Sequence, residues 1–123
     1  MTKIMIVDDE KESTDMLENI LKLEGYEYIS VNDSSEAVEI AGTFNPDMFL
    51  LDLMMPNIDG FKLCRMLRED PKFSRSPVII LTALSDTDSR AVAFGAGAND
   101  FLTKPYHLHE LVSKIKKFDP KGG

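Results

Sequence analysis

The chain has 123 residues, a hydrophobic content of 43% and a formal net charge of −7 at pH 7. This length is sufficient for one domain with its own core, without disulfides or a structural metal. The excess of 21 acidic over 14 basic residues argues against a nucleic-acid surface on this domain, because binding to phosphate backbones depends on Lys and Arg.

The single cysteine and the amino-terminal residues exclude further classes of protein. Cys64 cannot form a disulfide or a thiolate metal site within one chain, and we predict a buried structural thiol. The first apolar run is interrupted at Asp8, too early for a signal peptide, and no apolar run approaches the length that spans a membrane. We therefore expect a cytoplasmic protein without membrane contact.

Five short apolar runs alternate with five stretches of helical period. The predicted strands are residues 4–7, 26–31, 48–51, 78–81 and 101–102. The predicted helices carry the apolar residues of positions 16–23, 37–41, 61–67 and 91–94, and the last spans about residues 107–118, with Leu108, Leu111, Val112 and Ile115 facing inward. Residues 32–35 offer caps for the second helix, and Ser85-Asp86 can cap the fourth.

This alternation predicts an α/β fold. Five strands and five helices form a doubly wound (βα)5 arrangement, in which helices cover both faces of a five-stranded parallel sheet. No internal repeat, low-complexity block or interdomain linker occurs in the sequence. We expect one domain over residues 1–119, and a disordered tail or a truncation point at residues 120–123.

Asp52 directly follows the buried run of residues 48–51 and precedes Pro56. The pattern predicts a carboxylate at the carboxyl end of a strand, which is where ligands bind in open α/β sheets. A helix cap or a turn aspartate is the ordinary alternative for such a residue.

Polar residues follow four of the five predicted strands, and they would all lie at one edge of the sheet. They are Asp8, Asp9, Asp52, Thr82 and Lys104. Three carboxylates in one pocket repel each other unless a cation is present, and such an oxygen-rich site suits Mg²⁺. A lysine and a hydroxyl can bind phosphoryl oxygens. The set predicts a site that forms and holds an aspartyl phosphate.

Four motifs occur in order: Ile-Val-Asp-Asp-Glu at 6–10, Leu-Leu-Asp-Leu-Met-Met-Pro at 50–56, Leu-Thr-Ala at 81–83 and Leu-Thr-Lys-Pro-Tyr at 102–106. With these motifs the chain resembles the receiver domain of the response-regulator family of two-component signalling, over essentially its entire length. The resemblance implies a chemotaxis-regulator-like single receiver domain with the flavodoxin-like strand order 2-1-3-4-5.

The resemblance also implies roles for the acidic residues. Asp52 would be the phosphoacceptor and would take a phosphoryl group from a phosphohistidine on a sensor histidine kinase or a phosphotransfer protein. Asp9 would bind Mg²⁺ (or Mn²⁺) directly and Asp8 mainly through water, with Asp52 and the backbone carbonyl of Met54 completing the site. Such a domain catalyses only its own phosphorylation and dephosphorylation.

Further roles follow from the same resemblance. Thr82 and Lys104 would hold the phosphoryl oxygens, and Phe101 would be the switch aromatic that turns inward as Thr82 moves. The Lys104-Pro105 bond is expected to be cis. The fourth helix, fifth strand and fifth helix would form the face that binds a downstream protein effector or a second copy of the chain.

Two further expectations concern exposed positions. Met54 and Leu84 occupy the positions that in this family modulate the lifetime of the phosphoryl group. Because both are apolar and cannot position an attacking water, we expect slow self-dephosphorylation. His107 and His109 are expected to face solvent, since side chains two positions apart on a helix diverge and cannot share a metal.

Other functions remain as alternatives. A haloacid-dehalogenase-type phosphatase also uses a strand-end aspartate, but it places a second acid two residues later, where this chain has Met54. A flavodoxin-like carrier would need a phosphate loop, whereas Asp8, Asp9 and Glu10 would repel phosphate. Within the family, a phosphorelay shuttle and the amino-terminal receiver of a longer transcriptional or enzymatic regulator stay open.

Overall fold

The computed structural model describes residues 1–84 and 87–122. The strands are β1 (Lys3–Val7), β2 (Glu27–Val31), β3 (Met48–Asp52), β4 (Val78–Thr82) and β5 (Asp100–Thr103). The helices are α1 (Lys11–Leu23), α2 (Ala37–Phe44), α3 (Gly60–Glu69), α4 (Thr87–Gly95) and α5 (Leu108–Phe118), and a short 3-10 helix, η1 (Ser34–Glu36), precedes α2. The predicted caps of α4, Ser85 and Asp86, lie outside the described residues.

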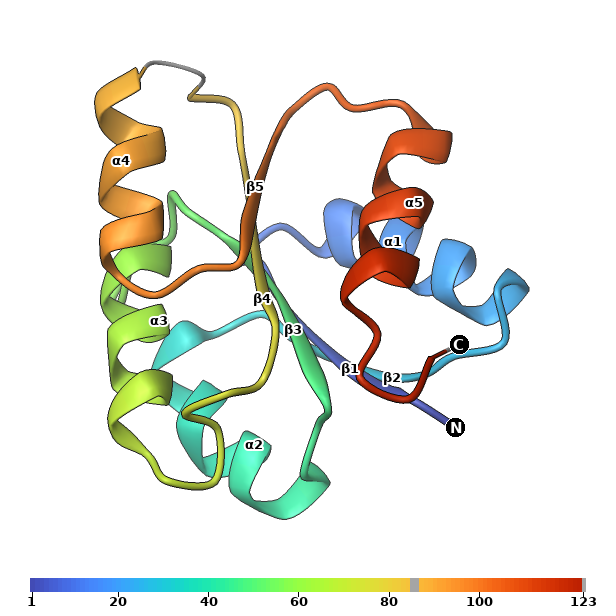
Figure 1. Ribbon diagram of the computed structural model, residues 1–123, viewed down its shortest axis with the longest axis horizontal. Coiled ribbons are helices and arrows are strands. Elements are labelled where there is room, and N and C mark those ends of the chain that lie inside the picture. Colours follow the sequence, from blue (N-terminus) through green and yellow to red (C-terminus); the bar gives the residue numbers. More distant parts are fainter. Residues whose placement is uncertain (85–86, 123) are drawn as a thin grey trace.

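All neighbouring strands are parallel, in the order β2-β1-β3-β4-β5, which confirms the predicted fold class and strand order. Helices α2, α3 and α4 cover one face of the sheet, and α1 and α5 cover the other (Figure 1). The chain therefore starts in the interior of the sheet and reverses its direction of winding between β1 and β3. A crevice outside the carboxyl ends of these two strands is the expected ligand site.

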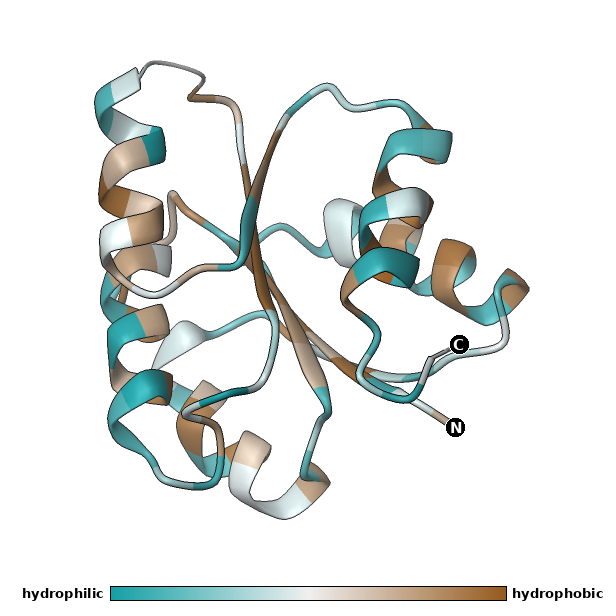
Figure 2. Ribbon diagram, viewed as in Figure 1, coloured by the Kyte–Doolittle hydropathy of each residue, from teal (hydrophilic) through white to brown (hydrophobic). Residues whose placement is uncertain are grey.

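The core lies on both faces of the three inner strands, which explains their uninterrupted apolar runs. These strands form the continuous hydrophobic band in the middle of Figure 2. On the α2–α4 side, the rings of Phe49 and Phe73 pack edge to face, with centroids 5.4 Å apart. On the other side, Leu17 and Leu21 of α1 join Leu111 of α5 in a second apolar cluster. The predicted burial of Cys64 is confirmed.

Helix α5 differs from its predicted pattern in the first turn. Leu111 and Ile115 are buried as expected and Val112 is half-buried, but Leu108 is 58% exposed, so its predicted inward orientation is wrong. Leu108 belongs to the same helical stripe as Leu111. It stays in solvent because the packing of α5 against the sheet begins one turn after the helix itself begins.

Helix ends follow the local sequence. Asp33 accepts a hydrogen bond from the Ser35 amide and caps η1, as expected for residues 32–35. Asp59 caps α3 by accepting from the Lys62 amide. Gly25, the predicted end of the first helix, has a φ of 83°, a backbone conformation that glycine adopts without steric cost.

Candidate functional site

The carboxyl edge of the sheet brings the predicted acidic residues together. Asp8 follows β1, Asp52 ends β3, and the pairing of Val7 with Leu51 places these two positions on adjacent strands. Asp8, Asp9 and Asp52 each offer one carboxylate oxygen, and these three oxygens lie within 4.8 Å of one another. Asp8 and Asp52 are buried, whereas Asp9 is exposed. The cluster therefore opens to solvent on the Asp9 side.

Lys104 reaches this cluster from the loop after β5. Its Nζ lies 3.2 Å from Asp8 Oδ2 and 3.4 Å from Asp52 Oδ1. The backbone amide of Lys104 donates to the carbonyl oxygen of Thr82 at 2.7 Å, which fixes the start of the loop to the end of β4. The Lys104-Pro105 bond is cis, as expected.

Burial and the charge of Lys104 act in opposite directions on the pKa of Asp52. Burial, and secondly the nearby Asp8 carboxylate, raise the pKa of Asp52 from 3.8 to about 6, against the opposing effect of Lys104. Burial also opposes the charge of Lys104, but the carboxylates of Asp52 and Asp8 outweigh it and raise the pKa of Lys104. Ionised Asp52 is thus disfavoured at this position, and a nearby cation would reduce that cost.

The donor chemistry fits a divalent cation. Among the described residues, one ammonium group, that of Lys104, contacts a cluster of three carboxylates. With all groups ionised, two negative charges remain uncompensated. An oxygen-only ligand set with one solvent-facing side is the environment that Mg²⁺ prefers, because this ion keeps part of its water shell.

Thr82 ends β4, the strand that pairs with the strand of Asp52, and Phe101 lies on β5, where it pairs with Ile80 of β4. Thr82 is fully buried, and its Oγ1 accepts a hydrogen bond from the Leu84 amide at 3.2 Å. Phe101 is only 3% exposed, so its ring already lies in the core, with the Arg90 guanidinium 5.7 Å from the ring centroid. The ring of this predicted switch aromatic therefore lies in the core of the structure.

The loop after Asp52 is exposed at Met54 and closely packed at Gly60, where α3 begins. Met54 is 64% exposed. Gly60 opens α3, and its amide donates to the carbonyl oxygen of Leu53 at 2.9 Å. A Cβ at position 60 would lie 2.5 Å from the carbonyl oxygen of Asp52, so only glycine allows α3 to begin this close to the backbone of the acidic residue.

Sequence reasoning gave no role to Gly60 or Tyr106. A glycine between a capping Asp and an apolar helix was a usable signal for the close approach at Gly60. Tyr106 is half-buried beside Lys104, and burial raises its pKa, with the Lys104 charge opposing. His107 and His109 are exposed, as expected.

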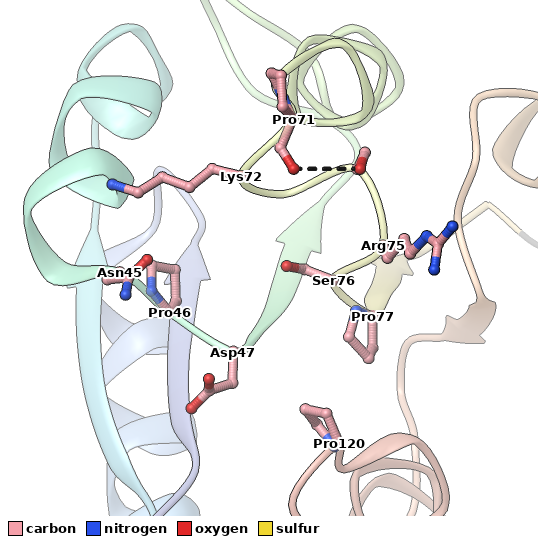
Figure 3. Close-up of a pocket in the computed structure, with 10 residues that line it drawn as sticks. Asn45, Pro46, Asp47, Pro71, Lys72, Arg75, Ser76, Pro77 and Pro120 are labelled. Carbon is pink, nitrogen blue, oxygen red and sulfur yellow. Dashed lines mark hydrogen bonds between the residues drawn. The ribbon is translucent and has the colours of Figure 1, made fainter.

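A polar cavity of about 430 Å³ lies at the opposite edge of the sheet, where the chain enters β3 and β4 (Figure 3). Its lining includes Asp47, Lys72 and Arg75. The charged ends of Lys72 and Arg75 point away from each other in Figure 3, so this cavity offers no convergent set of charges. The acidic cluster is therefore the stronger candidate site.

Comparisons with known proteins agree with this assignment. The family model described as the response regulator receiver domain matches residues 4–116. Over 116 residues, the chain is 34% identical to the DNA-binding dual master transcriptional regulator RpaA of Synechocystis sp., and the match covers 94% of this chain and 48% of that protein. The chain spans about half the length of the curated relatives it matches.

Two solved structures extend the comparison. The signal receiver domain of a signal transduction histidine kinase from Syntrophus aciditrophicus is 36% identical, with a TM-score of 0.88 and coverage of 96% of this chain and 89% of that one. The receiver domain of the sensor histidine kinase PA1611 from Pseudomonas aeruginosa is 31% identical, with a TM-score of 0.87 and coverage of 95% and 96%. The latter structure has a magnesium ion coordinated in its active-site cleft.

The family match decides against the phosphatase and flavodoxin alternatives. Receiver domains are the phosphorylated signalling modules of two-component systems, and they bind Mg²⁺ at an acidic pocket. No helix in residues 1–84 or 87–122 is both long and apolar enough to cross a membrane. From the match over residues 4–116 we conclude that the chain belongs to the response regulator receiver domain family.

Proposed function

We propose that Asp52 is the phosphoacceptor of this receiver domain and takes its phosphoryl group from a phosphohistidine of a sensor histidine kinase or a phosphotransfer protein. The observation that carries this proposal is the convergence of three carboxylate oxygens within 4.8 Å, with Lys104 Nζ 3.4 Å from Asp52. Asp8 and Asp52 are the two buried acids, and of these Asp52 ends a strand and has its pKa raised toward neutrality.

In the proposed step, a carboxylate oxygen of Asp52 forms a bond to phosphorus while the phosphorus–nitrogen bond of the donor histidine breaks. The electron pair of that bond returns to the imidazole nitrogen. Asp52 must be ionised to attack, and a pKa of about 6 leaves it mostly ionised at neutral pH. Lys104 then donates a hydrogen bond to a phosphoryl oxygen in place of its present contact with Asp52.

Asp8, Asp9, Asp52 and the backbone carbonyl of Met54 are the proposed ligands of Mg²⁺ (or Mn²⁺). When bound, this ion supplies positive charge that offsets the negative charge of the acids and of the incoming phosphoryl oxygens. The uncompensated charge of the cluster supports this part of the proposal.

Thr82 is proposed to bind a second phosphoryl oxygen. Its Oγ1 accepts from the Leu84 amide, so the hydroxyl hydrogen is available as a donor. A shift of Thr82 would be transmitted through β4 to Phe101, because Ile80 pairs with Phe101 in the sheet. The proposed output is a changed α4–β5–α5 face that binds a downstream effector or a second copy of the chain.

The experiment that tests the proposal is intact-mass spectrometry after incubation with acetyl phosphate and Mg²⁺. We expect one added phosphoryl group, about 80 Da, in the wild type and none in Asp52→Asn or in EDTA. No adduct in a folded, Mg²⁺-bound protein would contradict phosphorylation of this domain. An adduct that persists in Asp52→Asn would show that another residue is the acceptor.

A further inference from the structure

The loop between β3 and α3 carries the Met54 carbonyl, yet much of the loop itself lies in solvent. Met54 is 64% exposed, and Asn57 adopts a φ of 71°, a left-handed conformation that asparagine tolerates better than most residues other than glycine. Within the loop, the Ile58 amide donates to the Pro56 carbonyl at 3.0 Å. A loop of this kind keeps one shape only if neighbouring segments hold it.

Ser34 is the buried contact that holds this loop. It lies in η1, after β2, and is only 2% exposed. Its Oγ donates to the carbonyl oxygen of Pro56 at 2.9 Å and accepts from the amide of Ile58 at 3.0 Å. One hydroxyl thus bridges the residues on both sides of Asn57, although 22 to 24 positions separate the two segments.

Asp33 adds an exposed contact to the same turn. Its Oδ1 accepts from Asn57 Nδ2 at 3.1 Å, and also from the amide and the hydroxyl of Ser35 at 3.0 and 2.7 Å. Two consecutive residues of the β2–α2 connection therefore hold three consecutive residues of the β3–α3 loop. The sequence predicted only a capping role for this stretch, and Asp33 fills that role.

We propose that Ser34 is a positioning residue for the acidic site. By fixing Pro56 and Ile58, its hydroxyl fixes the path of the loop from Asp52 onward and hence the direction of the Met54 carbonyl. Pro56 transmits this constraint because its ring restricts φ to a narrow range. The inference rests on the proposed function, since it assumes that the Met54 carbonyl is a ligand of Mg²⁺.

The test compares Ser34→Ala with Ser35→Ala. Both substitutions remove one hydroxyl from η1, but the Ser35 hydroxyl is exposed and bonds to Asp33 rather than to the β3–α3 loop. We expect Ser34→Ala to weaken Mg²⁺ binding about tenfold by isothermal titration calorimetry, which is typical when a group that orients a metal ligand is lost. Ser35→Ala is expected to retain wild-type affinity.

A second readout separates positioning from simple stabilisation. With acetyl phosphate as donor, Ser34→Ala should be phosphorylated slowly at low Mg²⁺ and should approach the wild-type rate at saturating Mg²⁺. A lowered melting temperature with unchanged Mg²⁺ affinity would overturn the inference. If Ser34→Ala does not fold, Ser34→Cys is measured instead, because a thiol fills the same space but is a weak donor and acceptor, and an unchanged affinity would again overturn the inference.

The two proposals fail in different ways. If wild-type protein acquires no phosphoryl group at Asp52, the proposed function fails regardless of any Ser34 variant. If the wild type is phosphorylated at Asp52 and Ser34→Ala matches it in Mg²⁺ affinity and rate, only the role of Ser34 fails.

Discussion

The surroundings of the polar groups differ between the two edges of the sheet. At the carboxyl edge, Asp8, Asp9 and Asp52 are held together although they repel each other, and Lys104 offsets only part of their charge. At the amino edge, Asp47 pairs with Lys121 and accepts from the Lys3 amide. The carboxyl edge therefore carries an electrostatic cost that a bound cation would reduce, whereas the contacts at the amino edge stabilise the fold.

Arg68 illustrates the amino edge. Its guanidinium donates four hydrogen bonds, to the carbonyl oxygens of Gly97, Phe73 and Ser76 and to Asn99 Oδ1, at 2.6 to 2.9 Å. These bonds join the end of α3 to the connections that lead into β4 and β5. Hydrogen bonds thus make one edge of the sheet rigid, whereas the other edge of the same sheet is the one suited to binding.

The largest expected effect is the loss of the Arg68 contacts. Arg68→Ala removes one donor from each of these four oxygens, although the Phe73 carbonyl and Asn99 Oδ1 still accept from the amides of Ser76 and Val78, and we expect a loss of about 3 kcal/mol in the free energy of unfolding. Urea denaturation measures this change. Arg65→Ala, an exposed arginine on the same helix, is the matched control and should change stability by less than about 0.5 kcal/mol. Equal effects of the two substitutions would contradict the role given to Arg68.

Removing one charge from the carboxyl edge should have the opposite sign. In EDTA at pH 7, Asp52→Asn is expected to stabilise the protein by about 2 kcal/mol, because ionised Asp52 is disfavoured in the fold. Differential scanning calorimetry would detect the higher melting temperature. Asp47→Asn is the control at the amino edge, where Asp47 accepts from the Lys3 amide at 2.8 Å and pairs with Lys121 at 3.2 Å. It should not stabilise.

The effect of Mg²⁺ on the melting temperature gives a second test of the carboxyl edge. Mg²⁺ should raise the melting temperature of the wild type by binding the folded state, and should raise that of Asp52→Asn less. A lower melting temperature of Asp52→Asn in EDTA would mean that the Asp52 carboxylate makes net stabilising contacts.

The pH dependence follows from the raised pKa of Asp52. Because this pKa rises from 3.8 to about 6 on folding, the folded state retains the Asp52 proton between these values and the unfolded state does not. The contribution of Asp52 to stability therefore falls as pH rises from about 4 to about 6 and is constant above that. In EDTA, the stability gained by Asp52→Asn should be small at low pH and complete by neutral pH. A pH-independent gain would contradict the raised pKa.

The smallest expected effect concerns the lifetime of the phosphoryl group. Met54→Asn should shorten it about threefold, equivalent to ~0.7 kcal/mol in activation free energy, because an amide can orient an attacking water. The decay of the phosphorylated mass after removal of the donor measures this lifetime. Leu23→Asn, which alters an exposed leucine at the end of α1, should leave it unchanged. A wild-type lifetime of seconds would contradict slow self-dephosphorylation.

The sequence predicted those features that depend on the pattern of a single segment. Apolar runs located the strands, and the residues that follow them located the acidic cluster. Leu108 shows the limit of periodicity, because a helical stripe gives direction but not the point at which packing begins. The contacts of Ser34 with Pro56, and of Gly60 with the backbone of Asp52, join separate segments and follow from the folded geometry rather than from any local pattern.

Lys104 comes from the last strand connection, 96 positions after Asp8, with which it pairs. During synthesis, the acidic residues leave the ribosome well before the ammonium group that balances them. The charged cluster is therefore complete only once β5 has joined the sheet. Under the proposed function, only chains that are synthesised past residue 104 would be phosphorylated. A chain interrupted before that residue would not signal, even if its acidic residues were intact.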